Sequence, residues 1–252
     1  MPSMLDLLRM RASQPERMDG SGVPEAELAG AYRRLRMLNR LFAAAAPIRT
    51  GVERLWIEAG RPARLSVLDI GAGSGDVNRS LLRWAERNGI GIAIRLVDVR
   101  EEACREARRL FRGDARIEVA RGDLFDLPDQ AADIVTATQF VHHFGPDELP
   151  RVIRRMLGVS RIGVVLSDLR RHIVPWAAVW LTARLLTGNR CIRTDAPLSV
   201  ARGFREEDWD KLAIDGGIRE MWYARKAPYR YVVVIRKSGT EKGGDASGGQ
   251  DG

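Results

Sequence analysis

The sequence predicts an α/β fold in which a mostly parallel sheet is covered by helices on both faces. Residues 65–70 are aliphatic and β-branched, as in a buried parallel strand, and a glycine-rich turn and a helix-like run at residues 77–87 follow at once. Strand and helix then alternate as far as residue 167. Such alternation predicts a parallel sheet, because each helix returns the chain to the edge where the next strand begins.

The N-terminal residues are expected to form helices beside this sheet. Residues 1–23 are mixed and turn-rich. Apolar residues at intervals of three and four then predict a helix from Pro24 onward, and a second helix is expected at residues 48–59, ahead of Gly60. The residues that form the first pattern are Leu28, Tyr32, Leu35, Leu38 and Phe42.

The elements of the sheet follow in chain order. Strands are expected at residues 65–70, 92–97, 117–120, 134–138 and 163–167, with helices at residues 77–87, 101–111 and 147–157. An apolar, tryptophan-containing helix at residues 173–186 and a polar loop at residues 188–197 then interrupt the alternation. A helix at residues 205–214 and strands at residues 218–223 and 229–235 complete the sheet, and residues 238–252 are expected to be disordered because they are rich in Gly, Ser and Asp.

The composition is basic, but it does not indicate a nucleic-acid partner. The formal net charge is +8 and the sequence pI is about 10.1. However, 37 of the 41 basic residues are arginine, and they are spread over most helices instead of forming one stripe. Aromatic residues make up only 6% of the chain, so the stacking surfaces that bind single strands are scarce. We therefore attribute the charge to composition.

The cysteines and the N-terminus set expectations for metal binding and location. Two cysteines are too few for a disulfide framework, and no Cys/His cluster has metal-ligand spacing, so no metal site is expected. The N-terminal stretch carries charges within its apolar part and has no signal core, which predicts a cytoplasmic protein. Residues 173–186 contain Pro175 and Arg184 and are too few to span a bilayer, although peripheral membrane contact stays open.

The glycine turn narrows the choice of ligand. Gly71, Gly73 and Gly75 have the spacing G-x-G-x-G, whereas dinucleotide sites require G-x-G-x-x-G. No Lys-Ser or Lys-Thr pair follows, which excludes a P-loop. Asp69 precedes the turn and Asp98 ends the next strand, and this pair of acids suits a cationic ligand that carries a ribose. S-adenosylmethionine (SAM) is such a ligand.

Four motifs in the right order resemble the class I SAM-dependent methyltransferases. They are VLDIGAGSGD at residues 67–76, RLVDVR at 95–100, RGDLFDLP at 121–128 and DIVTATQFVHHF at 133–144. The HH pair and the SDLRR at residues 167–171 are similar to the small-molecule branch of quinone-biosynthesis and natural-product enzymes, of the type 11/12-like kind. The resemblance implies a Rossmann-like, seven-stranded sheet whose last strand is antiparallel.

The same resemblance implies a division of the chain. Residues 1–60 would form a helical lid, in which Tyr32, Leu35 and Asn39 are candidates for substrate contact. Residues 61–237 would form the SAM-binding domain, with residues 170–195 as an insertion on the substrate side.

The resemblance also assigns residues to the methyl donor. Asp98 would accept hydrogen bonds from the ribose hydroxyls, and Val99 would pack on the adenine. Asp123 would accept from the adenine amino group beside the backbone N–H of Leu124, although a turn aspartate that caps its own backbone is an alternative. Asp69 would orient the turn and the methionine amino group, or act only as a structural cap. The remaining cofactor-binding candidates are Gly71, Ala72, Gly73, Gly75 and Gln139.

Two histidines are candidates for catalysis. His142 and His143 follow the fourth strand, at the rim nearest the transferred methyl group in this fold. A phenol has a pKa near ~10 and an imidazole near ~6.5, so a positioned neutral histidine can take the proton of a hydroxyl acceptor as its oxygen attacks. We prefer His142 as the base, with Asp168 at the end of the fifth strand holding its tautomer. The alternative is that the pair only packs or caps a helix.

The sequence thus predicts a SAM-dependent methyltransferase that acts on a small, largely apolar acceptor. O-methylation of a phenolic or other hydroxyl group on a quinone-like or polyketide-like secondary metabolite is the preferred reaction. C-methylation of an activated aromatic ring, an RNA methyltransferase and a non-catalytic SAM-binding partner protein stay open, as do the acceptor's identity, the oligomeric state and the pathway.

Overall fold

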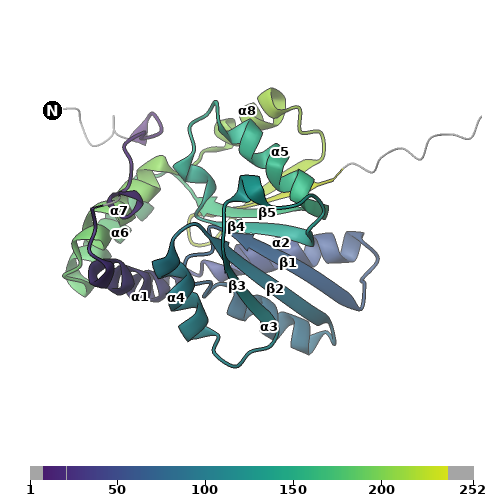
Figure 1. Ribbon diagram of the computed structural model, residues 1–252. Helices are drawn as coiled ribbons and strands as arrows, with labels where there is room; N and C mark the ends of the chain where they lie inside the picture. Colours follow the sequence, from purple (N-terminus) through teal and green to yellow (C-terminus); the bar gives the residue numbers. More distant parts are fainter. Residues whose placement is uncertain (1–7, 21, 238–252) are drawn as a thin grey trace, which may run out of the picture.

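A seven-stranded sheet forms the centre of the molecule (Figure 1). The computed structural model describes residues 8–20 and 22–237. The strand order is β3-β2-β1-β4-β5-β7-β6, and β7 is antiparallel to both of its neighbours while the other described pairs are parallel. The expected Rossmann-like α/β fold is therefore confirmed. The strands are β1 Arg64–Ile70, β2 Gly91–Asp98, β3 Ile117–Arg121, β4 Ala132–Thr138, β5 Ser160–Leu169, β6 Met221–Lys226 and β7 Arg230–Arg236.

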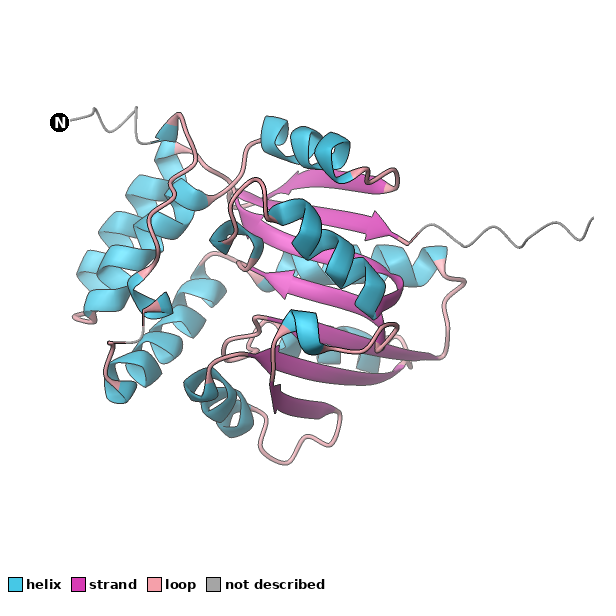
Figure 2. Cartoon of the chain, turned by 45° about the horizontal axis from the view of Figure 1, so that its top comes forward, coloured by secondary structure: helices cyan, strands magenta, loops and turns pink. Residues whose placement is uncertain are grey.

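Helices cover both faces of the sheet (Figure 2). One face packs against α5 and α8, and the other against α2 and α3, and each face has its own apolar core. Both cores are aliphatic-rich, as expected for strands that are buried on two sides. The helices of these layers are α2 Ala45–Glu58, α3 Asn78–Arg87, α4 Glu101–Leu110, α5 Leu149–Val159 and α8 Glu206–Gly216.

A group of helices packs together beside the carboxyl ends of the parallel strands. It comprises α1 (Glu25–Leu41), α6 (Ile173–Leu186) and α7 (Arg190–Arg202), and Figure 1 shows it to the left of the sheet. Three short 3-10 turns complete the described chain, η2 Arg17–Asp19, η3 Leu124–Asp126 and η4 Val141–His143. None of the described helices is both long enough and apolar enough to cross a membrane.

The expected polar loop at residues 188–197 is wrong, because most of it lies in the helix α7. Asn189 caps this helix, since its side chain accepts a hydrogen bond from the N–H of Ile192. Cys191, Ile192 and Val200 are buried, together with Asp195 and Pro197. The helix thus has an apolar face that its polar and proline residues conceal in the sequence.

The strand expected at residues 218–223 begins three residues later, at Met221. Gly217 adopts the left-handed conformation, with φ of 62°, and ends α8. The N–H of Ile218 still donates to the carbonyl of Ala213 in α8, so the chain leaves the helix before it can pair with β7. The expected disorder at residues 238–252 lies outside the described residues.

Candidate active site

A cavity of about 310 Å³ opens at the carboxyl ends of β1, β2 and β4. Its walls come from the glycine turn after β1, from Asp98 and Val99 after β2, and from the residues that follow β4. The helix α1 and the segment that contains η2 close it from the other side. We call this space the donor cavity. Its position is the usual one for ligands of open α/β sheets.

The turn after β1 depends on glycine. Gly71, Gly73 and Gly75 have φ values of 60°, 57° and 68°. A Cβ on Gly71 would lie 2.3 Å from the ring of Phe140, and one on Gly75 would lie 2.4 Å from Leu96. The same atom on Gly73 would point toward the donor cavity, 3.7 Å from Tyr32. Only glycine therefore allows both this backbone and a ligand in close contact with it.

Asp98 faces the donor cavity and holds the glycine turn. Its Oδ2 accepts a hydrogen bond of 2.8 Å from the N–H of Gly73, and its Oδ1 accepts one of 2.9 Å from the N–H of Arg100. Burial raises the pKa of the Asp98 carboxyl, and the two N–H donors oppose that effect. Each carboxylate oxygen keeps a free lone pair, so both could accept from the vicinal hydroxyls of a ribose.

Asp69 is fully buried and does not line the donor cavity. It accepts hydrogen bonds of 2.6 Å from Asn78 and 2.8 Å from Thr136, and Asn78 also donates to the carbonyl of Gly75. Burial raises the pKa of Asp69 to about 6, against the effect of both donors. Asp69 therefore orients the glycine turn through Asn78, without facing the donor cavity itself.

Asp123 and Leu124 also lie outside the lining of the donor cavity. The Asp123 side chain is exposed and accepts a hydrogen bond of 2.9 Å from the N–H of Phe125, which caps η3. Leu124 is buried in the core. The structure thus shows the turn-capping arrangement that was the alternative for Asp123, while Ala72, Val99 and Gln139 do line the cavity.

The end of β4 is joined to α1 by a polar contact. Gln139 has a left-handed backbone, with φ of 53°, which is strained for a residue that is not glycine. Its side chain donates to Asn39 at 2.9 Å, and Asn39 in turn donates to Asp76 at 3.2 Å. Tyr32, Leu35 and Asn39 all line the donor cavity, at positions expected to touch a ligand.

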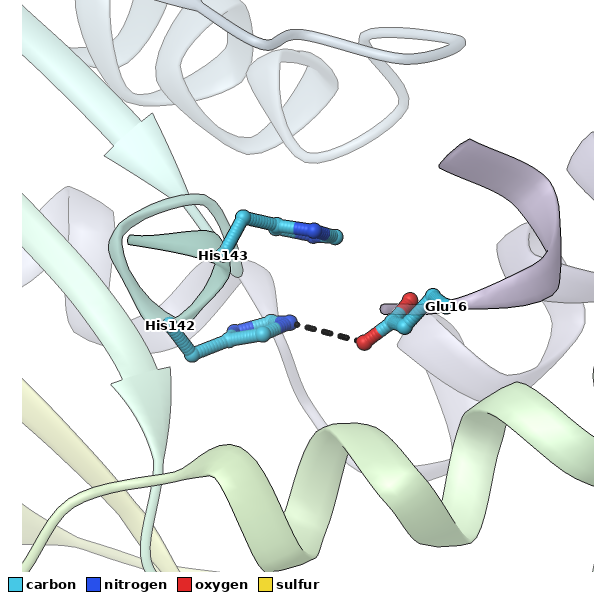
Figure 3. Close-up of side chains that lie close together, drawn as sticks. All are labelled: Glu16, His142 and His143. Atoms are coloured by element: carbon cyan, nitrogen blue, oxygen red, sulfur yellow. Dashed lines mark ion pairs between the residues drawn. The ribbon is translucent and has the colours of Figure 1, made fainter. Parts of the chain in front are cut away.

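The two histidines after β4 stack on each other, with ring centroids 4.4 Å apart (Figure 3). His142 is 2% exposed, and its Nδ1 lies 2.8 Å from Asp168 Oδ1, within hydrogen-bond distance. Its Nε2 lies 3.3 Å from Glu16 Oε1. His143 is less buried, and its Nδ1 lies 2.9 Å from Asp19 Oδ2.

Glu16 and Asp19 were missed by sequence reasoning. They lie at η2 in a segment that looks irregular and has no periodic pattern. Asp195 on α7 places this segment, because its carboxylate accepts from the N–H groups of Arg17 and Met18 at 3.0 and 2.8 Å. These hydrogen bonds join residues more than 170 positions apart in the chain, so no local sequence pattern could have predicted them.

The two carboxylates that face His142 keep its ring charged. Burial alone would lower the pKa of His142, but the charges of Asp168 and Glu16 outweigh it and raise the pKa to about 9. The pKa values of Asp168 and Glu16 are in turn below their usual range, because the imidazolium outweighs their burial. In this arrangement His142 is protonated at neutral pH, so it can accept a proton only at higher pH or after Glu16 moves away.

A pH dependence of stability follows. The pKa of His142 is raised from 6.5 to about 9, so the charged ring stabilises the fold fully below pH ~6.5, and this stabilisation of at most about 3 kcal/mol is lost as the pH rises to about 9. Denaturant titrations of the wild type and His142→Gln at pH 6.5 and 9 measure the free energy of unfolding. We expect a smaller decline for the variant, and equal declines would contradict the assignment.

A second, mainly apolar cavity adjoins the donor cavity. The two share Leu35, Asn39, Gln139 and Ser199 in their linings. We call it the acceptor cavity. Its other lining residues are Leu38, Phe42, Leu169, Pro175, Val179, Ala196, Val200, Pro228, Tyr229 and Arg230.

Arg230 is the charged residue of the acceptor cavity. It is 3% exposed, and its Nε donates to the carbonyl of Phe42 at 3.1 Å. Its Nη1 is buried and has no hydrogen-bond partner among the described residues. Burial lowers the pKa of Arg230 to about 10, against the attraction of Asp168 and Asp76. An unpaired buried donor of this kind is costly, so a ligand oxygen that reached it would be bound favourably.

Comparisons with known proteins agree with this geometry. Residues 67–163 match the family model described as a methyltransferase domain, and this range runs from within β1 to the first residues of β5. Residues 67–163 therefore carry a methyltransferase domain, set in a sheet with the Rossmann-like strand order described above. No curated protein sequence matches this chain.

Several solved structures share the fold of this chain. Human N-acetylserotonin methyltransferase in complex with SAM is 14% identical, with a TM-score of 0.63 over 93% of this chain and 65% of its own. A SAM-dependent methyltransferase from Aquifex aeolicus is 17% identical, with a TM-score of 0.58 over 83% and 98% of the two chains. The CMeT domain of a citrinin polyketide synthase is 15% identical, with a TM-score of 0.52, and the methyltransferase spans only 47% of that chain.

Proposed function

We propose that the methyltransferase transfers the methyl group of SAM to a hydroxyl oxygen of a small, largely apolar molecule, such as a phenolic quinone-like or polyketide-like metabolite. The observation that best supports this proposal is that the apolar acceptor cavity adjoins the donor cavity at Asn39 and Gln139. Ligand pockets are typically apolar with a few polar groups, and this pocket has that composition, although its volume of about 50 Å³ is smaller than the ~300 Å³ of typical ligand pockets. The free Nη1 of Arg230 suits an acceptor that also carries a carbonyl or phenolate oxygen.

SAM fits the donor cavity on two features of its walls. The backbone at Gly73 leaves open the space that a side chain would fill, and Asp98 offers carboxylate lone pairs beside it. Asp98 would hold the ribose and Val99 would lie against the adenine. SAM supplies an electrophilic methyl group when bound, so the protein must supply alignment and removal of the acceptor proton.

His142 or His143 would remove that proton. Both line the donor cavity, and Asp168 and Asp19 each contact Nδ1 of one ring. Nε2 of His143 is left for a substrate, whereas Nε2 of His142 becomes available once Glu16 moves away. Methyl transfer to an activated ring carbon, the second candidate, also needs a neighbouring hydroxyl to be deprotonated, so the same base would serve. We retain C-methylation as the second candidate because the chain is similar in fold to a polyketide synthase CMeT domain.

The helices α1, α6 and α7 would serve as a lid. They supply much of the acceptor cavity's lining and lie beside the carboxyl ends of the strands (Figure 1). Residues 25–41 therefore bring Asn39 to the junction of the two cavities.

An RNA acceptor is the alternative substrate class. Binding of RNA by the purified protein, with an affinity that falls as the salt concentration rises, would indicate it.

Narrowing the acceptor cavity tests this proposal. Val179 on α6 is 8% exposed and lines the cavity, so Val179→Phe is expected to raise KM for the acceptor by about tenfold or more at unchanged SAM affinity, since overpacking costs about 1–3 kcal/mol. Steady-state rates with SAM and a panel of hydroxylated aromatic compounds provide the measurement. Leu185→Phe is the matched control, because Leu185 lies on the same helix, is 73% exposed and does not line the cavity. Equal KM values for the two variants would argue against the acceptor cavity.

A further inference from the structure

Three side chains with metal-ligating atoms converge at one end of the donor cavity. Glu16, His142 and His143 each offer one ligand atom, and these atoms all lie within 4.8 Å of one another. Figure 3 shows the two stacked rings facing the carboxylate across a short gap. Two imidazoles and one carboxylate are a common donor set for catalytic zinc and for other divalent transition metals.

The outer contacts of this cluster are those of a metal site. In metalloproteins a ligating histidine typically donates its other ring N–H to a carboxylate, which fixes the tautomer. Here Asp168 lies 2.8 Å from Nδ1 of His142, and Asp19 lies 2.9 Å from Nδ1 of His143. The third ligand is oriented as well, because the hydroxyl of Ser199 donates to Glu16 Oε1 at 2.6 Å.

The ligand atom of His142 is buried and faces Glu16 without a well-formed hydrogen bond. Its Nε2 is buried and makes no hydrogen bond to any described residue, although Glu16 Oε1 lies 3.3 Å away. Two ligands at ~2.0–2.1 Å from a tetrahedral ion are themselves separated by roughly 3.3–3.4 Å. The spacing of these two atoms therefore already suits an ion between them, and His143 would need to approach by at most about 1.5 Å on the same tetrahedral geometry.

The charges at the site also favour a cation. Glu16, Asp19 and Asp168 bring three carboxylates to the two rings. Arg202 and Arg11 lie nearby, but they donate to the backbone carbonyls of His142 and His143 and thereby fix the position of η4. Arg100 also lines the donor cavity and acts on Asp19. With neutral rings, a divalent ion would add a positive charge beside Glu16, between the two imidazoles.

We propose that Glu16, His142 and His143 bind a divalent transition-metal ion, with zinc as the best match to the donor set. All three residues line the donor cavity, so a ligand in that cavity could reach an ion held there. The ion ties the N-terminal segment to the end of β4 and so closes this side of the cavity. It also polarises an oxygen that reaches it, which makes a hydroxyl more acidic without a free imidazole.

Metal titration of the full-length protein tests the proposal without an assay of activity. Metal-free protein is titrated with zinc chloride by calorimetry, and with cobalt(II) while its visible absorption is recorded. We expect one equivalent of zinc to bind and the cobalt spectrum to show low-symmetry coordination by nitrogen and oxygen. Glu16→Gln and His143→Gln are expected to abolish this binding, and His172→Gln, which alters the other histidine of the chain, is expected to retain it.

A positioning role for Asp168 gives an independent readout. Asp168→Asn should weaken zinc binding by about 10–100-fold, the usual effect of removing an outer partner. Thermal unfolding and SAM titration of each variant show whether it is folded. Absence of stoichiometric binding by the wild type, or binding that survives in folded Glu16→Gln and His143→Gln, would overturn the proposal and leave Glu16 and His142 as an ion pair only. Because SAM binding is measured separately, this outcome leaves the proposed methyl transfer intact.

Discussion

Replacing His142 by glutamine is expected to lower kcat by about a hundredfold to ten-thousandfold while SAM affinity stays unchanged. The ring lies between Asp168 and Glu16 at the rim of the donor cavity, where a proton acceptor for a hydroxyl is needed. Since these carboxylates raise the pKa of His142 to about 9, only a small fraction of the ring is neutral at pH 7. The wild-type rate should therefore rise with pH until about pH 9. Steady-state rates between pH 6.5 and 9.5 measure both effects.

His143→Gln is the companion variant. If His143 is the base, this substitution causes the large loss and His142→Gln does not abolish the reaction. Wild-type rates in both variants would contradict the assignment of a histidine base. Sensitivity of the wild-type rate to a metal chelator separates a free imidazole from an ion that is bound by the same rings.

The fold follows from local features of the sequence to a large extent. The strand that ends at Ile70, its glycine turn and the helix α3 are adjacent in the chain, and each is specified by short-range pattern and backbone freedom. Errors occur where tertiary packing decides. The residues of α7 look like a loop because arginines, Asp195 and Pro197 hide the buried Ile192 and Val200. Burial of that face against α1 and α6 is not encoded by any local signal.

The candidate site likewise combines residues that sheet topology places and residues that long-range contacts place. Asp98, His142 and Asp168 follow or end parallel strands, and topology alone brings such residues to one edge of the sheet. Glu16 and Asn39 reach this edge through contacts with residues far away in the chain, and the sequence does not reveal such contacts. For Asp123 the local hydrogen bond to Phe125 is a preference of the turn itself, so the motif does not fix where the side chain points.

Replacing Asp98 by alanine is expected to weaken SAM binding by about a hundredfold or more. Two hydrogen bonds from ribose hydroxyls to a charged acceptor contribute about 1.5–3 kcal/mol each, and the variant lacks both. It also leaves the N–H of Gly73 without its acceptor in the glycine turn. Asp98→Asn keeps the size of the side chain and one acceptor oxygen, so it should retain partial affinity, as calorimetry can measure. Val99→Ala alters only the neighbouring apolar contact and is expected to have a smaller effect.

Calorimetric titration of the wild type and Asp98→Ala with SAM and its demethylated product is the most direct test of the donor cavity. The structure predicts saturable binding at one site in the wild type and no measurable binding in the variant, with the thermal unfolding of the variant showing that it is folded. Lack of binding by the wild type, or equal affinity in both proteins, would contradict the assignment of this cavity to SAM.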